Sequence, residues 1–220
     1  MTRSFDLRNL KLLGLLLGTL ATLPVVRADK YFETLREDRY VPVHCRDFGV
    51  KNFREVREWF VYGIDGYQKR GFDYEYPVSR TEATWLWEAF KKNKEPTEWP
   101  RNLDREVELI KTHKEPMGFE FGSEGEVLEL LALVDLEERF SRRDYFMTGG
   151  LVYRSRPEAP TTGELDLLVG DMKTCNIVAV GEAKLGSSGL SKAKEQIARF
   201  KGFLRSRMGQ RLEIFSQLNY

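Results

Sequence analysis

The spacing of apolar residues changes from a helical to a strand-like period in the second half of the chain. After Ser123, apolar residues recur three and four positions apart, at Val127, Leu130, Leu131 and Val134. Ser123 and Glu126 precede this run with the spacing of a capping box, in which each residue bonds the backbone of the other. The pattern predicts a core helix that begins near Ser123.

Three strand-like runs and a second helical run follow. The strand-like runs span 145–155, 164–170 and 176–185. Helical spacing then returns at Ala193, Ile197, Phe200 and Leu204, up to about Met208, with Gly209 as a plausible stop. A last run, RLEIFSQL, is compatible with a strand. The order of helix, three strands, helix and strand predicts an α/β fold with a mixed sheet flanked by helices.

Residues 29–118 have a different, aromatic-rich character. Phe53, Val56 and Phe60 follow one another at helical spacing, and Ser79 with Glu82 forms another capping box. We therefore expect a mainly helical extension over 29–118, ahead of a core over 119–220.

The first 28 residues have the layout of a secretory signal peptide. Basic residues precede an apolar run from Leu12 to Val26, which ends at the small residue Ala28. The run is shorter than the ~20 residues of a membrane-spanning helix, although an uncleaved anchor is an alternative. Both readings put the domain outside the cytoplasm, and cleavage predicts a secreted or periplasmic protein with no stable membrane partner. Nothing in the sequence indicates an oligomeric state.

The charge is nearly balanced overall and uneven locally. Loss of residues 1–28, with four bases and one acid, changes the formal charge from +1 to −2. Residues 187–220 carry seven basic and two acidic residues, which suits a polyanion or a solvated helix face. Four of these bases are candidate DNA contacts: Lys192, Lys194, Arg199 and Lys201.

Cys45 and Cys175 are the two cysteines of the chain. An even number in an exported protein is compatible with one disulfide, and two buried free thiols are the alternative.

Charged residues interrupt two of the strand-like runs. Because side chains alternate along a strand, Glu182 and Lys184 share a face, as do Glu164 and Asp166. A short hairpin near residues 170–175 would bring Asp166 close to Glu182. The alternatives are a solvated cross-strand pair for Glu182 and Lys184, and a turn or edge position for Asp166.

Two carboxylates and an amine at one point suit metal-assisted hydrolysis of a phosphodiester. Mg²⁺ or Mn²⁺ takes carboxylate ligands, here Asp166 and Glu182, while Lys184 orients the attacking water. Glu126 on the preceding helix would reach the metal directly or through a water, unless it serves only its capping box.

These residues resemble the PD-(D/E)XK nuclease superfamily, in the branch related to archaeal junction resolvases. The resemblance covers roughly residues 119–215 and rests on G-E-L-D, E-A-K and a helix with Gln196 four residues before Phe200. It implies a restriction-endonuclease-like αβββαβ core, catalytic residues Asp166, Glu182, Lys184, Glu126 and Gln196, and DNA as the substrate. Leu165 stands where the family name has proline, and Gln196 taken singly suits a surface helix position.

The sequence thus predicts an exported, Mg²⁺- or Mn²⁺-dependent deoxyribonuclease. A catalytically silent nucleic-acid-binding module, a ribonuclease and a junction-specific nuclease are the alternatives. Only two histidines are present, outside any zinc motif, and no phosphate-binding G-x-x-x-x-G-K-[ST] loop exists. We therefore expect no zinc hydrolase and no nucleotide cofactor.

Overall fold

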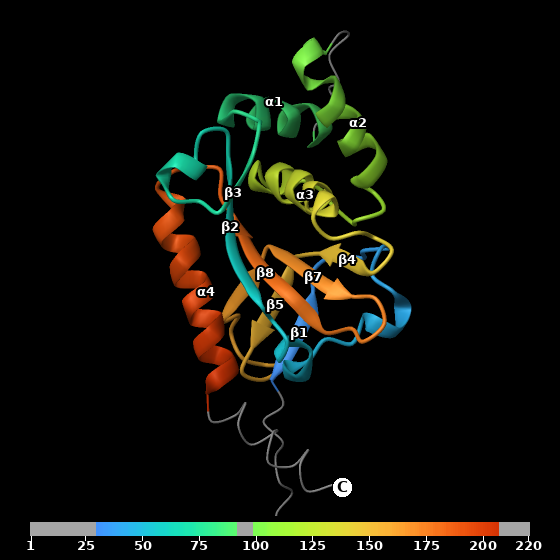
Figure 1. The fold of residues 1–220 in the computed structure, drawn as a ribbon, viewed down its shortest axis with the longest axis vertical. Helices are drawn as coiled ribbons and strands as arrows, with labels where there is room; N and C mark the ends of the chain where they lie inside the picture. Colours follow the sequence, from blue (N-terminus) through green and yellow to red (C-terminus); the bar gives the residue numbers. More distant parts are fainter. Residues whose placement is uncertain (1–29, 92–98, 207–220) are drawn as a thin grey trace, which may run out of the picture.

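A mixed five-stranded sheet forms the centre of the fold (Figure 1). The structure is a computed structural model that describes residues 30–91 and 99–206. The strands, in spatial order, are β3 (Tyr74–Tyr76), β2 (Glu58–Ile64), β8 (Ile177–Ala183), β7 (Leu167–Asp171) and β4 (Tyr145–Thr148). β2 runs parallel to both β3 and β8, whereas β7 is antiparallel to β8 and β4.

A smaller antiparallel sheet is joined to the five-stranded sheet by two strands that bend from one sheet into the other. It contains β1 (Tyr31–Thr34), β5 (Leu151–Arg154) and β6 (Gly163–Leu165). The predicted strand over 145–155 bends at Gly149 and Gly150 into β4 and β5, and that over 164–170 bends at Asp166 into β6 and β7. The two bent strands pair with one another on both sides of the bend.

Four α-helices in the described part of the chain cover the two faces of the central sheet (Figure 1). They are α1 (Arg80–Lys91), α2 (Asp104–His113), α3 (Gly125–Asp135) and α4 (Gly189–Arg205). Short 3₁₀ helices span Val43–Cys45, Val50–Phe53, Gln68–Arg70, Arg101–Leu103 and Leu136–Glu138. Alternation along β2 separates the two faces: Phe60 packs in the cluster that contains α3, and Val61 packs with Ile197 of α4.

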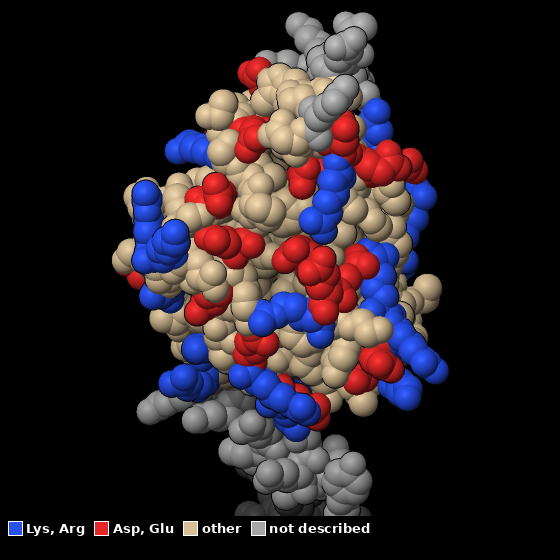
Figure 2. Space-filling model, turned by 45° about the horizontal axis from the view of Figure 1, so that its top comes forward, with Lys and Arg blue, Asp and Glu red and all other residues tan. Residues whose placement is uncertain are grey.

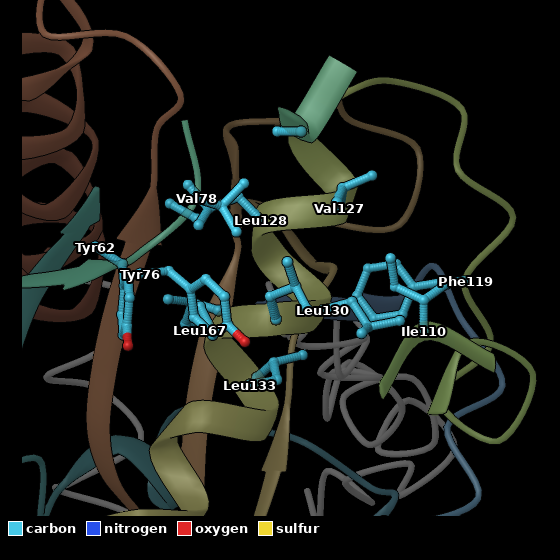
Figure 3. Packing of buried hydrophobic residues seen from close by; sticks show 14 of the residues in the cluster. Tyr62, Tyr76, Val78, Ile110, Phe119, Val127, Leu128, Leu130, Leu133 and Leu167 are labelled. Atoms are coloured by element: carbon cyan, nitrogen blue, oxygen red, sulfur yellow. The ribbon is translucent and has the colours of Figure 1, made fainter. Parts of the chain in front are cut away.

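The helix α3 is buried on more than one side. Leu128 and Leu130 are almost inaccessible to solvent, and the apolar residues of α3 meet the sheet as well as α1 and α2 (Figure 3). α1 begins with the predicted capping box, since the Ser79 backbone N–H donates to Glu82 (2.8 Å) and the Glu82 N–H to Ser79 Oγ (3.2 Å).

The described residues of the segment 29–118 are helical only in part, and the strands among them were not predicted. They contain β1, β2 and β3 as well as α1 and α2. Phe53 closes a 3₁₀ helix and Phe60 lies in β2, so their helical spacing is a coincidence of two elements. β2 reads EWFVYGI, and because its last five residues are buried, no polar alternation marks it as a strand.

β2 lies directly beside β8 in the sheet and runs parallel to it. The predicted strand over RLEIFSQL, the predicted end of the last helix at Met208 and Gly209, and the signal peptide lie outside the described residues. Within the residues described, no helix is long and apolar enough to cross a membrane.

Cys45 and Cys175 form a disulfide, so the alternative of two free thiols is wrong. The bond joins the 3₁₀ helix Val43–Cys45 to the turn between β7 and β8.

Candidate metal centre

Asp166 lies at the bend between β6 and β7, where the chain passes from one sheet to the other. The backbone of Gly149 packs against this bend so closely that a Cβ there would stand 1.8 Å from the Asp166 carbonyl oxygen. Only glycine fits that approach. The Asp166 carboxylate turns toward β8, where its Oδ2 accepts the backbone N–H of Ala183 (3.0 Å).

The end of β8 presents Glu182 and Lys184 on the face that carries Val180. Val180 packs in the cluster around Phe200. Strict alternation would place Val178 on that same face. It instead packs in the α3 cluster, because the pairing with β7 skips one residue of β8 between Ile177 and Ala179. The backbone of Lys184 is fixed by β2, since its N–H donates to the Tyr62 carbonyl oxygen (3.0 Å).

Asp166, Glu182 and Lys184 meet at one point. Lys184 Nζ lies 2.6 Å from Asp166 Oδ2 and 2.9 Å from Glu182 Oε2. Exposed fractions are 10% for the side chain of Asp166, 0% for Glu182 and 19% for Lys184. The β7–β8 hairpin therefore creates the proximity that the sequence predicted, inside the protein and with one cation facing two carboxylates.

Burial and crowding perturb the ionisation of this group. Burial, with the charge of Asp166 adding to it, raises the pKa of Glu182 to about 9. Burial alone would lower the pKa of Lys184, but the charges of Asp166 and Glu182 outweigh it and raise that pKa. Lys184 is therefore a permanent cation at neutral pH, held by a pair of carboxyl groups that resist carrying two negative charges.

One oxygen of this group receives no hydrogen bond from a described N–H donor. Lys184 donates to Glu182 Oε2, whereas the buried Glu182 Oε1 has no such donor, and a hydrogen bond between the Glu182 and Asp166 carboxyl groups contributes to the raised pKa of Glu182. A buried carboxylate oxygen without a partner is costly. Oxygen donors from Asp166 and Glu182 are the ligands that Mg²⁺ or Mn²⁺ prefers, so the residues present fit such an ion.

Glu126 does not join this group. Its Oε1 instead accepts the backbone N–H of Ser123 (3.2 Å), which is half of the capping box. Among the described residues, the three side chains that could together hold a metal ion, with ligand atoms within 4.8 Å of one another, are His44, Cys45 and Cys175. Neither Glu126 nor another described carboxylate thus completes a three-carboxylate set with Asp166 and Glu182 at that separation.

Glu129, one turn further along α3, was not among the residues predicted from the sequence. Burial raises the pKa of Glu129 to about 8, and the charge of Asp166 adds to the shift. Arg36 opposes it, with Nη1 at 3.6 Å from Glu129 Oε2. Because Glu126 and Glu129 are three residues apart, they share a side of the helix, and this i,i+3 spacing was the available signal.

An acidic cavity of about 720 Å³ opens beside the group. Six glutamates line it, against two arginines: Glu37, Glu115, Glu120, Glu126, Glu129 and Glu164. Burial, then the charge of Asp166, raises the pKa of Glu164, so the cavity and Asp166 are close enough to interact electrostatically. On the face shown in Figure 2, Asp and Glu side chains gather near the middle, with Lys and Arg side chains both among them and along the sides.

The remaining predicted residues lie on α4. Lys192, Lys194 and Arg199 are exposed, and the half-buried Lys201 holds its Nζ 4.4 Å from the centre of the Trp59 ring. Gln196 is half-buried, and its Oε1 has no hydrogen-bond partner among the described residues. The structure shows no hydrogen bond between Gln196 and the group around Asp166.

Comparisons of the chain with models of protein families, with characterised proteins and with solved structures found no match.

Proposed function

We propose that the protein is an exported nuclease that hydrolyses DNA phosphodiester bonds with the help of Mg²⁺ or Mn²⁺. The observation that carries this proposal is the convergence of Asp166, Glu182 and Lys184, with Lys184 Nζ 2.6 Å and 2.9 Å from the two carboxylates. These residues come from a strand bend and a strand end, and each would be costly to bury without a use.

Asp166 and Glu182 are the residues that would hold the metal ion. Bound there, the ion would polarise a phosphate oxygen and lower the pKa of a bound water. Lys184, being permanently charged, would orient the attacking water and stabilise the charge that develops on the phosphate. The fully buried Glu182 also excludes bulk water from one side of the group.

Glu129 is our candidate for the helix carboxylate of the reaction, in place of Glu126. The charge of Asp166 contributes to its raised pKa, and Arg36 Nη1 lies 3.6 Å from its Oε2. Glu126 lines the same cavity, and Gln196 remains a candidate on α4.

The acidic cavity imposes an order on binding. The glutamates of the cavity outnumber its two arginines even with Glu129 protonated and would repel a polyanion, so a divalent cation should bind before DNA does. The exposed bases of α4, Lys192, Lys194 and Arg199, would then contact phosphates away from the cavity.

A restriction-endonuclease-like core is part of the proposal. The sequence α3, β4, β7, β8 and α4 follows the expected order of helix, three strands and helix. The neighbouring parallel strand comes from upstream, as β2. Export is supported by the disulfide, since such bonds persist in oxidising compartments.

The test is an assay of the purified, oxidised protein on supercoiled and linear DNA with Mg²⁺ or Mn²⁺. We expect cutting that EDTA and Asp166→Asn abolish, and that Asp104→Asn, an exposed aspartate at the start of α2, leaves intact. Folded protein that is inert on DNA and RNA with either metal contradicts the proposal. If Mg²⁺ then also leaves thermal stability unchanged, the silent binding module becomes the better reading.

A further inference from the structure

A second group of metal-ligating atoms surrounds the disulfide. A ring nitrogen of His44 and the sulfurs of Cys45 and Cys175 all lie within 4.8 Å of one another. Soft sulfur with imidazole suits Zn²⁺, in contrast to the carboxylates at Asp166 and Glu182. While the sulfurs are bonded to each other they are not thiolates and cannot serve as strong ligands.

The backbone around both cysteines is fixed by bonds other than the disulfide. The Cys45 N–H donates to the Pro42 carbonyl oxygen (2.8 Å) and the Cys175 N–H to that of Asp171 (2.9 Å). The buried Asn52 donates from Nδ2 to the Cys175 carbonyl oxygen (2.9 Å). After reduction, these hydrogen bonds would keep the two thiols near each other and near His44.

His44 has the environment of a metal ligand. Its Nε2 lies 3.0 Å from the Met172 carbonyl oxygen, so a proton on Nε2 is donated to that oxygen. The other nitrogen, Nδ1, is then unprotonated and available, and the ring is oriented by the same kind of backbone contact that supports metal-bound histidines. His44 is exposed and Cys175 is half-buried, so a reductant and an ion can reach the group.

We propose that reduction converts this disulfide into a Zn²⁺ site with ligands His44, Cys45 and Cys175. With a trialkylphosphine as reductant, phosphorus attacks one sulfur and water supplies the oxygen of the phosphine oxide. The S–S bond breaks, and both sulfurs become thiols. Binding of Zn²⁺ then releases the two thiol protons, and solvent takes the fourth tetrahedral position.

The site would be controlled by the redox state of its surroundings. A reducing compartment would favour the metal-bound form. A small-molecule disulfide would take two electrons from the thiolates by exchange and leave as two thiolates, which re-forms the Cys45–Cys175 bond and releases the ion. In both states the 3₁₀ helix Val43–Cys45 stays tied to the turn between β7 and β8. This inference is independent of the proposed nuclease activity.

The experiment is a Co²⁺ titration of the full chain, oxidised or reduced by the phosphine. The reduced protein should show a thiolate-to-Co²⁺ charge-transfer band that saturates at one equivalent and disappears when Zn²⁺ is added. The oxidised protein should show none. Asp166→Asn should keep the band, because a carboxylate centre contributes no thiolate transition. His44→Gln should weaken Co²⁺ binding by about tenfold or more.

Two results would overturn the proposal: no charge-transfer band in the reduced protein, or unchanged Co²⁺ affinity in reduced His44→Gln. If the metal-free reduced chain unfolds, its circular dichroism spectrum is measured with and without Zn²⁺. Zn²⁺ must then restore the native spectrum to the wild type and do so less effectively for His44→Gln, and failure to restore it refutes the site.

Discussion

Replacing Lys184 by methionine should destabilise the metal-free protein in a way that depends on pH. The variant keeps most of the apolar stem but removes the cation between Asp166 and Glu182. Removing one partner of a buried ion pair costs about 3–5 kcal/mol. For a domain of this size that corresponds to a fall in Tm of about 6–20 °C.

The pH dependence follows from protonation of the two carboxyl groups. Without Lys184, no buried cation balances these two carboxyl groups, so the folded variant should hold an extra proton that the unfolded chain releases as pH rises. Stability from groups with raised pKa values is present at low pH and lost as pH rises. The cost of Lys184→Met should therefore be small near pH 5 and grow by up to about 1.4 kcal/mol per pH unit for each extra proton that the folded state holds.

The assay is urea denaturation with EDTA at pH 5, 6.5 and 8, followed by circular dichroism. Lys192→Met is the matched control, because Lys192 is exposed on α4 and its loss should change stability by less than about 0.5 kcal/mol. A loss for Lys184→Met that is the same at every pH, or no larger than the control, would show that Lys184 does not neutralise a buried acidic pair.

Three further results are expected. In EDTA, wild-type Tm should fall as pH rises from about 5 to 9, because the pKa of Glu182, about 9, lies above its value in the unfolded chain. Glu182→Gln should flatten this dependence of Tm on pH. A wild-type Tm that rises over the range contradicts the raised pKa of Glu182. Gly181→Val should cost about 1–3 kcal/mol or more in urea denaturation, because a Cβ at Gly181 stands 2.2 Å from the Phe60 ring, and a neutral effect would mean that the ring has room to move. In calorimetry, the free energy of unfolding of the oxidised wild type should be about 2–5 kcal/mol larger than that of the double variant Cys45→Ser, Cys175→Ser. Equal Tm values would show that the disulfide does not stabilise the fold.

The sequence predicted best where local patterns and tertiary structure agree. The Ser79–Glu82 box, the α3 helix and the β7–β8 hairpin all follow from short-range spacing and turn chemistry. Convergence of charge at Asp166 and Glu182 followed from strand alternation, which holds from Ala179 onward. The extra residue Val178 is a bulge, and it reverses which side chains point to which face in the part of β8 before Ala179. The pattern of apolar residues in the sequence does not reveal a bulge of this kind.

The parts that could not be predicted depend on contacts between distant segments. β2 has no periodic signal because β8, β3 and both helical layers bury it. Glu129 lies on the same side of the helix as Glu126. It differs from Glu126 through its interactions with Asp166 and Arg36 in the folded protein. Neither neighbour is near it in the sequence.

The pairing of β2 with β8 also affects how the protein can be made and divided. β2 is synthesised first, yet it must wait for a partner more than half the chain length away, and such a long closure slows folding. A fragment that begins at residue 119 would contain Asp166, Glu182 and Lys184 but would lack Tyr62, whose carbonyl oxygen fixes the Lys184 backbone. β8 would become an unprotected edge prone to aggregation. We therefore expect the charged group to form only where β2 is present beside β8, either in the intact chain or after two separately expressed pieces, 30–118 and 119–220, are combined.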